Sequence, residues 1–213
     1  MQKPMQKTVQ KTVQKTADTN YPIHELIAGR WSPLAFGRQP VSRETIGTLL
    51  EAARWAASCY NEQPWRYLVA MREDGASFER LAGCLVEGNA WAREAPVLLL
   101  AVACTTFERN GKPNAHAWYD VGLSVANLVL QAESLGLRAH QMAGFDGDRA
   151  RRVLSIPTDH DPIAMIALGA PGDASTLPAS LAAREAAPRE RRPLDTIAFG
   201  AGWGERAPLA GTE

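Results

Sequence analysis

Helical and strand-like patterns follow one another along this chain without a repeating unit, and this order predicts an α+β fold rather than a doubly wound parallel sheet. Two bulk observations favour one globular domain. The chain has 213 residues, of which 46% are hydrophobic, and this is sufficient for a full core. Its longest apolar runs are of strand length, well short of the ~18 residues that a membrane-spanning helix needs.

The first third of the chain predicts two helices and a strand. Apolar residues at helical spacing predict a helix over Tyr21–Gly29, which ends at a glycine, as many helices do. Ser42 is a suitable N-cap for a second helix that runs towards Ala57. The alternating segment Arg66–Met71 then predicts a strand.

The middle of the chain holds its most apolar segments. Phe78–Val86 predicts a helix, and Val97–Cys104 predicts a strand that is buried on both faces. Ala115–Leu135 is the longest helical stretch, and its apolar stripe is too wide for a helix that is covered on one side only. We therefore expect this helix at the centre of the fold or in a subunit interface.

Shorter elements follow the long helix. We expect a short segment at Arg138–Met142, a turn at Gly144–Asp146, a helix over Asp148–Leu154 and a strand over Ile163–Leu168. From Gly169 onward, repeated prolines predict an extended arm. An arm of this length usually wraps around another surface.

The first residues differ in composition from everything after them. Lys3, Lys7, Lys11 and Lys15 occupy the first sixteen residues without any acid, so the net charge of zero leaves four excess acids in the remainder. A Gln-Lys-Thr-Val unit is repeated within this tail. Four lysines are a weak basis for nucleic-acid or membrane binding. We therefore expect residues 1–20 to be a non-catalytic extension, with no nucleic-acid or membrane partner.

Several familiar chemistries have no support in the sequence. There is no Walker loop, no Gly-x-Gly-x-x-Gly turn and no Gly-x-Ser-x-Gly elbow. The four histidines lie far apart without a second ligand at helical spacing, so we expect no metal. The three cysteines have neither zinc nor disulfide spacing, which favours a reducing cytoplasm.

Two polar segments suit a flat phosphorylated cofactor. Ser58–Trp65 joins a helical pattern to a strand pattern with small hydroxyl, thiol and amide groups. Arg30 and Ser32 follow a helix end, and arginine and hydroxyl groups are suited to phosphate. A second arginine cluster, Arg189–Arg192, could close on the same anion. Alternatively, the arginines are surface charges, and the loop amides only satisfy backbone groups. Cys59 could also be a nucleophile, although the sequence shows no base placed to activate it.

These segments resemble the FMN-dependent nitroreductase family. The resemblance is carried by Arg30-Trp31-Ser32-Pro33-Leu34-Ala35-Phe36, Ser58-Cys59-Tyr60-Asn61-Glu62-Gln63-Pro64-Trp65, Gly136-Leu137 leading to Gly144-Phe145-Asp146, and Arg191-Arg192-Pro193-Leu194. Each motif alone is weak, but four in the same order are specific. The resemblance implies a flavin-binding domain over residues 21–199, followed by an extension over 200–213.

The resemblance also implies a fold and a site. The fold would be an α+β sandwich in an intertwined homodimer, with the long helix at the interface, an embracing C-terminal arm and two FMN molecules between the chains. No side chain would be catalytic, because flavin N5 carries the hydride and the Ala143 amide orients it. The cofactor-binding residues would be Arg30, Trp31, Ser32, Leu34, Ala57, Ser58, Cys59, Asn61, Gln141, Met142, Ala143, Gly144, Arg189 and Arg191.

Two positions depart from the family pattern. Leu34 stands where relatives usually carry a lysine or arginine beside N1 and O2 of the flavin ring. Without that cation, the reduced anionic flavin is less stabilised, and this predicts a lower midpoint potential. Ala143 precedes Gly144 where some relatives carry glutamate, so only a backbone role can transfer.

The activity implied by the resemblance is hydride transfer from NADH or NADPH through FMN to a small flat acceptor, such as a nitroaromatic, a quinone or an activated alkene. Two alternatives stay open. The same fold serves reductive dehalogenation and flavin-fragmenting chemistry. The chain could also bind flavin without turnover.

Overall fold

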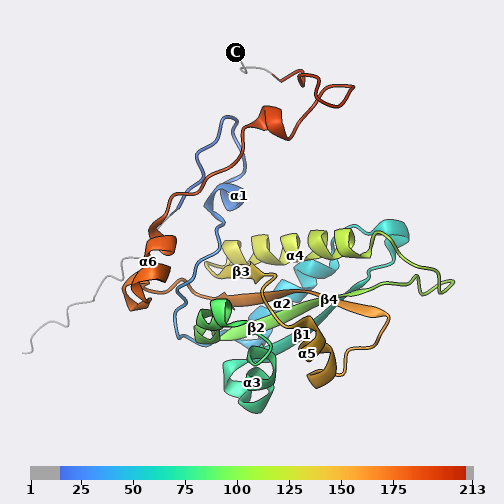
Figure 1. The fold of residues 1–213 in the computed structure, drawn as a ribbon. Helices are drawn as coiled ribbons and strands as arrows, with labels where there is room; N and C mark the ends of the chain where they lie inside the picture. Colours follow the sequence, from blue (N-terminus) through green and yellow to red (C-terminus); the bar gives the residue numbers. More distant parts are fainter. Residues whose placement is uncertain (1–14, 210–213) are drawn as a thin grey trace, which may run out of the picture.

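The computed structural model describes residues 15–209, and its centre is a four-stranded antiparallel sheet (Figure 1). The strands are β1 (Trp65–Met71), β2 (Val97–Cys104), β3 (Arg138–Met142) and β4 (His160–Gly169), in the spatial order β1-β2-β4-β3. β2 and β4 are therefore the inner strands. The basic repeat of the tail before residue 15 lies outside the described residues.

Strand β2 separates two hydrophobic cores. Val97, Leu99 and Ala101 belong to one core cluster, whereas Leu98 and Leu100 belong to the other. Because successive side chains of a strand point to opposite faces, β2 is buried on both sides. This confirms the sequence-based expectation of a doubly buried strand.

Helices cover both faces of the sheet. α2 (Arg43–Arg54) and α4 (Ala117–Ser134) contribute to the first core cluster, and α3 (Ala76–Ala82) and α5 (Gly147–Val153) contribute to the second. Figure 1 shows these two helical layers with the sheet between them. The remaining elements are α1 (Glu25–Gly29), α6 (Ala179–Ala186) and the 3-10 segments η1 (Cys59–Asn61), η2 (Arg72–Asp74), η3 (Glu87–Glu94), η4 (Ala174–Thr176) and η5 (Leu194–Thr196). The α+β class is confirmed.

Several element boundaries differ from the expectations. α1 begins only at Glu25, because the His24 ring accepts a hydrogen bond from the Leu26 amide and caps the helix at 3.2 Å. The expected helix over Phe78–Val86 begins and ends earlier, at Ala76 and Ala82. The chain then continues into η3.

Strand β4 is longer than expected and contains Pro162. A register shift lies here, because Ala101 pairs with Ala164 while the next residue of β2, Val102, pairs with Pro162. One extra residue on β4 forms a bulge, which is a position where a strand tolerates proline. The bulge therefore allows β4 to begin at His160, before the proline and before the expected start at Ile163.

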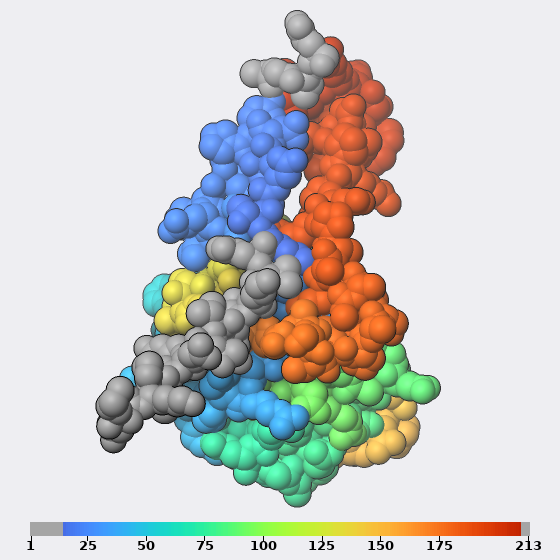
Figure 2. All heavy atoms as spheres, turned by 90° about the vertical axis from the view of Figure 1, so that its left-hand side faces the viewer, coloured from blue at the N-terminus to red at the C-terminus, as the bar shows by residue number. Residues whose placement is uncertain are grey.

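The C-terminal arm contains a helix that the prolines concealed. α6 follows Pro178 and is rich in alanine, the residue with the highest helix propensity. Beyond α6 the chain extends away from the sheet beside the segment that carries α1 (Figures 1 and 2). Hydrogen bonds join these two segments, from Lys15 Nζ to Ala187 O at 2.6 Å and from Arg189 Nη1 to Ala28 O at 2.6 Å. Among the described residues, no helix is long and apolar enough to cross a membrane.

Candidate functional site

The sequence-predicted phosphate-binding residues come together at the C-terminal end of α4. Arg30 follows α1, and its Nη1 lies 3.4 Å from the Ser32 hydroxyl oxygen. Burial lowers the pKa of the Arg30 guanidinium, and the charge of Arg191 lowers it further. The pKa of Arg189 is lowered by burial and by both neighbouring arginines. Three cations that repel one another in this way form a site suited to an anion.

A carboxylate that was not predicted lies inside this arginine cluster. Glu133 sits in the last turn of α4, and its Oε2 is 3.0 Å from Nη1 of Arg138. Burial raises its pKa, while Arg138, Arg30 and Arg189 oppose that effect. An acid at a helix C-terminus is unfavourable to the helix dipole. Its place is therefore explained by the arginines around it.

A second carboxylate ties the arm to the Arg30–Phe36 segment. Glu185 of α6 is 3% exposed, and its Oε2 accepts a hydrogen bond of 2.7 Å from the Leu34 amide. The Leu34 side chain is buried beside Phe36 in the second core cluster. Its predicted contact with a flavin ring stays a prediction.

The Ser58–Asn61 segment has an unusual backbone. Tyr60, Asn61 and Gln63 have φ values of 54°, 57° and 52°, a left-handed conformation that non-glycine residues seldom adopt. The Ser58 hydroxyl accepts a hydrogen bond from the Gln63 amide at 3.0 Å, which closes the turn. Such conformations persist only where surrounding contacts enforce them, and they are common at functional sites.

The other end of α4 anchors this strained segment. The Cys59 amide donates to Oδ2 of Asp120 at 3.0 Å, and Asp120 is only 2% exposed. Asp120 lies in the first turn of α4, where a negative charge is favourable to the helix dipole. Ala57 precedes the segment and is exposed, and the Cys59 thiol is half-buried.

The end of β3 provides a third group of predicted residues. Gln141 and Ala143 are exposed, while Met142 is buried in the second core cluster. The Asn89 side chain donates to the Gly144 carbonyl at 2.9 Å. A Cβ on Gly144 would lie 2.4 Å from the Asn89 amide nitrogen. A larger residue at position 144 would therefore displace the Asn89 amide from its present position.

A cavity of about 860 Å³ opens beside Leu34. Its lining includes Leu34, Phe36, Trp91, Leu177 and Leu181, with charged groups such as Arg38 and Glu94. The Trp91 indole N–H is buried and has no hydrogen-bond partner within residues 15–209. The cavity is of a size that holds small planar ligands.

The predicted residues thus form separate groups in one chain rather than a single ring around a ligand, and two of these groups lie at opposite ends of α4. The arginine cluster faces Glu133, whereas the Ser58–Asn61 segment is bonded to Asp120. These two acids are thirteen residues apart on α4, which corresponds to about 20 Å along the helix axis. The Trp31 side chain is buried near the first group, with Lys15 Nζ 4.9 Å from its ring centre.

Four residues at the site were missed by sequence reasoning, namely Asn89, Asp120, Glu133 and Glu185. A signal existed for Asp120, because a carboxylate within a wide apolar stripe is unexpected unless it has a buried partner. The partners of Asn89 and Glu185 lie far away in the sequence, and Glu133 is close to the distant Arg30 and Arg189 as well as to nearby Arg138. No local pattern marks them.

Comparisons with known proteins identify the family. The model of the Nitroreductase family matches residues 27–89 and 85–170 of this chain. The chain therefore belongs to the Nitroreductase family, and the resemblance seen in the sequence is confirmed.

Individual relatives agree with this assignment. A solved structure of an oxidoreductase containing FMN is 37% identical, with a TM-score of 0.83 over 89% of this chain and 96% of that chain. An uncharacterized 15.4 kDa protein in the ask 5' region of Mycolicibacterium smegmatis is 38% identical over 60% of this chain and 85% of that protein. An NADH dehydrogenase of Thermus thermophilus is 28% identical over 76% of this chain and 87% of that protein.

The anchoring role of Asp120 generates a prediction about stability. Asp120→Ala should lower the free energy of unfolding by roughly 1–3 kcal/mol, because the Cys59 amide loses its charged partner. Urea unfolding followed by circular dichroism measures this change. Asp195→Ala, at an exposed position in η5, is the matched control and should change stability by less than about 0.5 kcal/mol. Equal stability of the two variants would contradict the anchoring role.

Proposed function

We propose that this chain is an FMN-dependent oxidoreductase that acts as a homodimer and transfers hydride from NADH or NADPH to a small flat acceptor. The observation that carries the proposal is the similarity to the solved FMN-containing oxidoreductase, which extends over 89% of this chain. The NADH dehydrogenase of Thermus thermophilus supports a nicotinamide donor. Nitroaromatics, quinones and activated alkenes are the acceptor classes that we propose.

The arginine cluster fits the phosphate end of FMN. Arg30, Arg189 and Arg191 provide guanidinium donors in mutual repulsion, and the Ser32 hydroxyl is exposed beside them. A phosphate dianion would relieve that repulsion and accept several charge-assisted hydrogen bonds. The charge of Glu133 offsets part of the positive charge of Arg30 and Arg189.

The segments near Asp120 and Gly144 fit the ring end of FMN. The amide of Asn61 can pair with the polar edge of a flavin, and Ser58 and Cys59 are small enough to lie beside the ring. At the end of β3, Ala143 is exposed beside the contact of Asn89 with Gly144. The flavin would supply the hydride chemistry itself, and these groups would orient it.

A twofold dimer would bring the two groups of residues together. In an isologous dimer each surface patch meets its own copy, so two antiparallel α4 helices would place the Asp120 end of one beside the Glu133 end of the other. The outward face of α4 is suited to this contact, because it presents apolar and small residues that are exposed or half-buried. They are Tyr119, Gly122, Leu123, Ala126 and Leu130.

The arm gives independent support for a dimer. Beyond α6 it carries Ile197, which is 63% exposed, and Trp203, which is 93% exposed. Figure 2 shows that this part of the chain stands away from the body of its own subunit. Large apolar side chains on a projecting arm mark an interaction surface. We propose that the arm wraps around the second subunit.

An anaerobic titration tests the activity directly. The purified protein should carry a flavin absorbance that bleaches with NADH or NADPH and returns when a nitroaromatic or quinone is added, because reduction and reoxidation occur at one flavin. A protein that binds FMN but is not bleached by either nucleotide would contradict the enzyme and favour a binding protein. Failure to bind FMN at all would contradict the cofactor.

Removal of one cluster arginine should weaken the binding of FMN but not that of riboflavin, which lacks the phosphate. Arg191→Ala should weaken FMN binding by about tenfold to a hundredfold, the value of a lost charged hydrogen bond, and leave riboflavin binding nearly unchanged. Quenching of flavin fluorescence measures both affinities. Arg192→Ala, one residue along at another exposed position, is the control. Equal losses for both flavins would contradict a phosphate role.

Mixed dimers test whether two chains share each site. Arg191→Ala impairs one half of the site, and Asn61→Gly impairs the other while glycine keeps the positive φ of 57°. Each variant alone should bind FMN weakly. A heterodimer formed from both should regain one normal site out of two, because its two wild-type halves meet across the interface. No recovery in isolated heterodimers would show that each chain builds its own site.

A further inference from the structure

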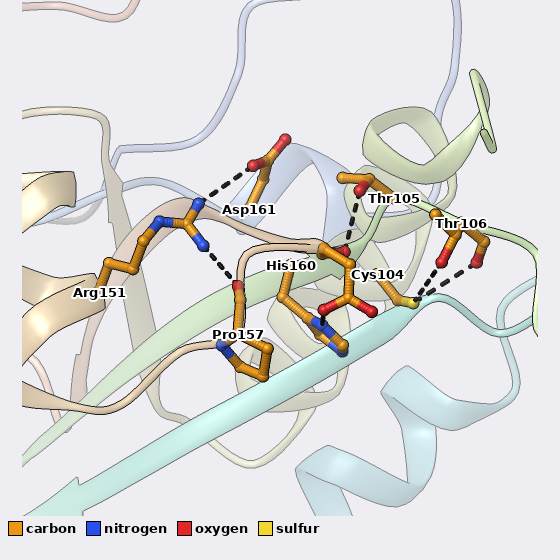
Figure 3. A network of polar contacts seen from close by, with 8 residues as sticks. Cys104, Thr105, Thr106, Arg151, Pro157, His160 and Asp161 are labelled. Carbon is orange, nitrogen blue, oxygen red and sulfur yellow. Dashed lines mark hydrogen bonds and ion pairs between the residues drawn. The ribbon is translucent and has the colours of Figure 1, made fainter. Parts of the chain in front are cut away.

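Three metal-ligating side chains meet at the ends of β2 and β4, outside the proposed flavin site (Figure 3). They are Cys104, Asp159 and His160, and one potential ligand atom from each lies within 4.8 Å of the other two. Cys104 is the last residue of β2 and pairs directly with His160, the first residue of β4. Directly paired residues of antiparallel strands have their side chains on the same face. Strand pairing therefore fixes the thiol and the imidazole as neighbours.

The backbone around these side chains is held in place. Thr105 donates to the Asp159 carbonyl from its amide at 2.8 Å and from its hydroxyl at 2.9 Å. The Cys104 amide donates to the Pro64 carbonyl at 2.8 Å. Of the side chains, the Cys104 thiol has only a weak contact, at 3.5 Å from the Thr106 carbonyl oxygen, whereas His160 Nδ1 lies 2.8 Å from Asp159 Oδ1. A fixed backbone with adjustable side chains is a favourable starting point for a ligand set.

We propose that Cys104, Asp159 and His160 bind a zinc ion, with water as the fourth ligand. Thiolate, imidazole and carboxylate are the protein ligands of Zn²⁺, and three of them with water make a tetrahedral site. The thiol loses its proton when the metal binds, and no oxidation state changes. A thiolate in the set disfavours Mg²⁺ and Ca²⁺, which prefer oxygen ligands.

The geometry requires only small side-chain movements. Zinc bonds of ~2.0–2.3 Å separate tetrahedral ligand atoms by about 3.5 Å. Separations of up to 4.8 Å would therefore close by roughly 1 Å, whereas the 2.8 Å contact between His160 Nδ1 and Asp159 Oδ1 would open by a little less than that. Cys104 and His160 are half-buried and Asp159 is exposed, so these rotations are not blocked by core packing.

Arg151, which lies in the same polar network, does not compete for the site. Arg151 Nη2 lies 3.3 Å from Asp161, and its Nη1 donates to the Pro157 carbonyl. In Figure 3 its guanidinium points to these two groups. Asp161 also accepts from the Trp118 indole at 3.2 Å. The charge of Arg151 is thus committed to Asp161 rather than to Asp159.

A zinc ion here would fasten the two inner strands at one end of the sheet. The contact from Cys104 to Pro64 links the site to the base of the Ser58–Trp65 segment, so the metal would restrain that segment as well. This proposal replaces the sequence-based expectation of no metal. Helical spacing could not reveal the site, because strand pairing joins residues 104 and 160. The proposal does not depend on flavin binding.

Cobalt and zinc titrations of the tag-free full chain test the site. Co²⁺ should produce the charge-transfer absorption of a cobalt–thiolate bond at one equivalent, and Zn²⁺ should abolish it. With free Zn²⁺ at about one hundred times Kd, the unfolding temperature should rise by roughly 5–10 °C. Cys104→Ser should eliminate the thiolate band, and His160→Ala should weaken zinc binding at least about tenfold.

Matched controls separate this site from other cysteines and histidines. Cys84→Ser and His116→Ala remove one thiol and one imidazole elsewhere and should bind both metals like the wild type. Circular dichroism checks that each variant is folded. If His160→Ala does not fold, the near-isosteric Asp159→Asn provides another ligand variant. A wild type without the thiolate band would overturn the proposal. So would unchanged zinc affinity in the folded ligand variants.

Discussion

The packing of α4 against α2 is the interaction on which the rest of the structure depends. The last carbonyls of a helix have no partner within the helix itself. At the end of α2, the hydroxyl of Ser124 donates to the Ala53 carbonyl at 2.9 Å, and the amide of Asn127 donates to the Ala52 carbonyl at 3.2 Å. These polar groups lie within an otherwise apolar helix face. They fix where α2 ends and hence where the Ser58–Trp65 segment begins.

The carboxylates at the two ends of α4 extend the same constraint to the site. Burial of an acid is costly unless charged or hydrogen-bonding partners compensate for it. Asp120 is compensated by the Cys59 amide, and Glu133 by Arg138 and the neighbouring arginines. Each acid therefore holds one group of the predicted ligand contacts. A rigid helix separates these two groups within one chain, and this separation is the reason for proposing that two subunits share each site.

Sequence periodicity was sufficient for the elements whose environment is uniform. β2 is apolar at every position because both faces are buried, and α4 has a wide stripe because it is central. Periodicity was insufficient where a contact with a residue far along the chain overrides a local conformational preference. Pro162 is accommodated by a bulge that only the pairing with β2 reveals, and Glu185 is explained only by the Leu34 amide. At the candidate site, residue types indicated the phosphate end, but Asn89 and Glu133 could be found only after folding.

The strained turn at Tyr60–Gln63 connects local backbone conformation with the proposed subunit contact. Three residues with positive φ cost of order 1 kcal/mol or more each, and glycine at these positions would avoid that cost. The chain instead carries tyrosine, asparagine and glutamine there. Arg109 lies 4.2 Å above the Tyr60 ring and the Gln63 side chain donates to the Asn61 carbonyl, but Tyr60 is still 74% exposed. Ser58 closes the turn and Asp120 anchors it, but the Tyr60 and Asn61 side chains remain exposed. In the proposed dimer, the second subunit and its ligand would cover this exposed surface.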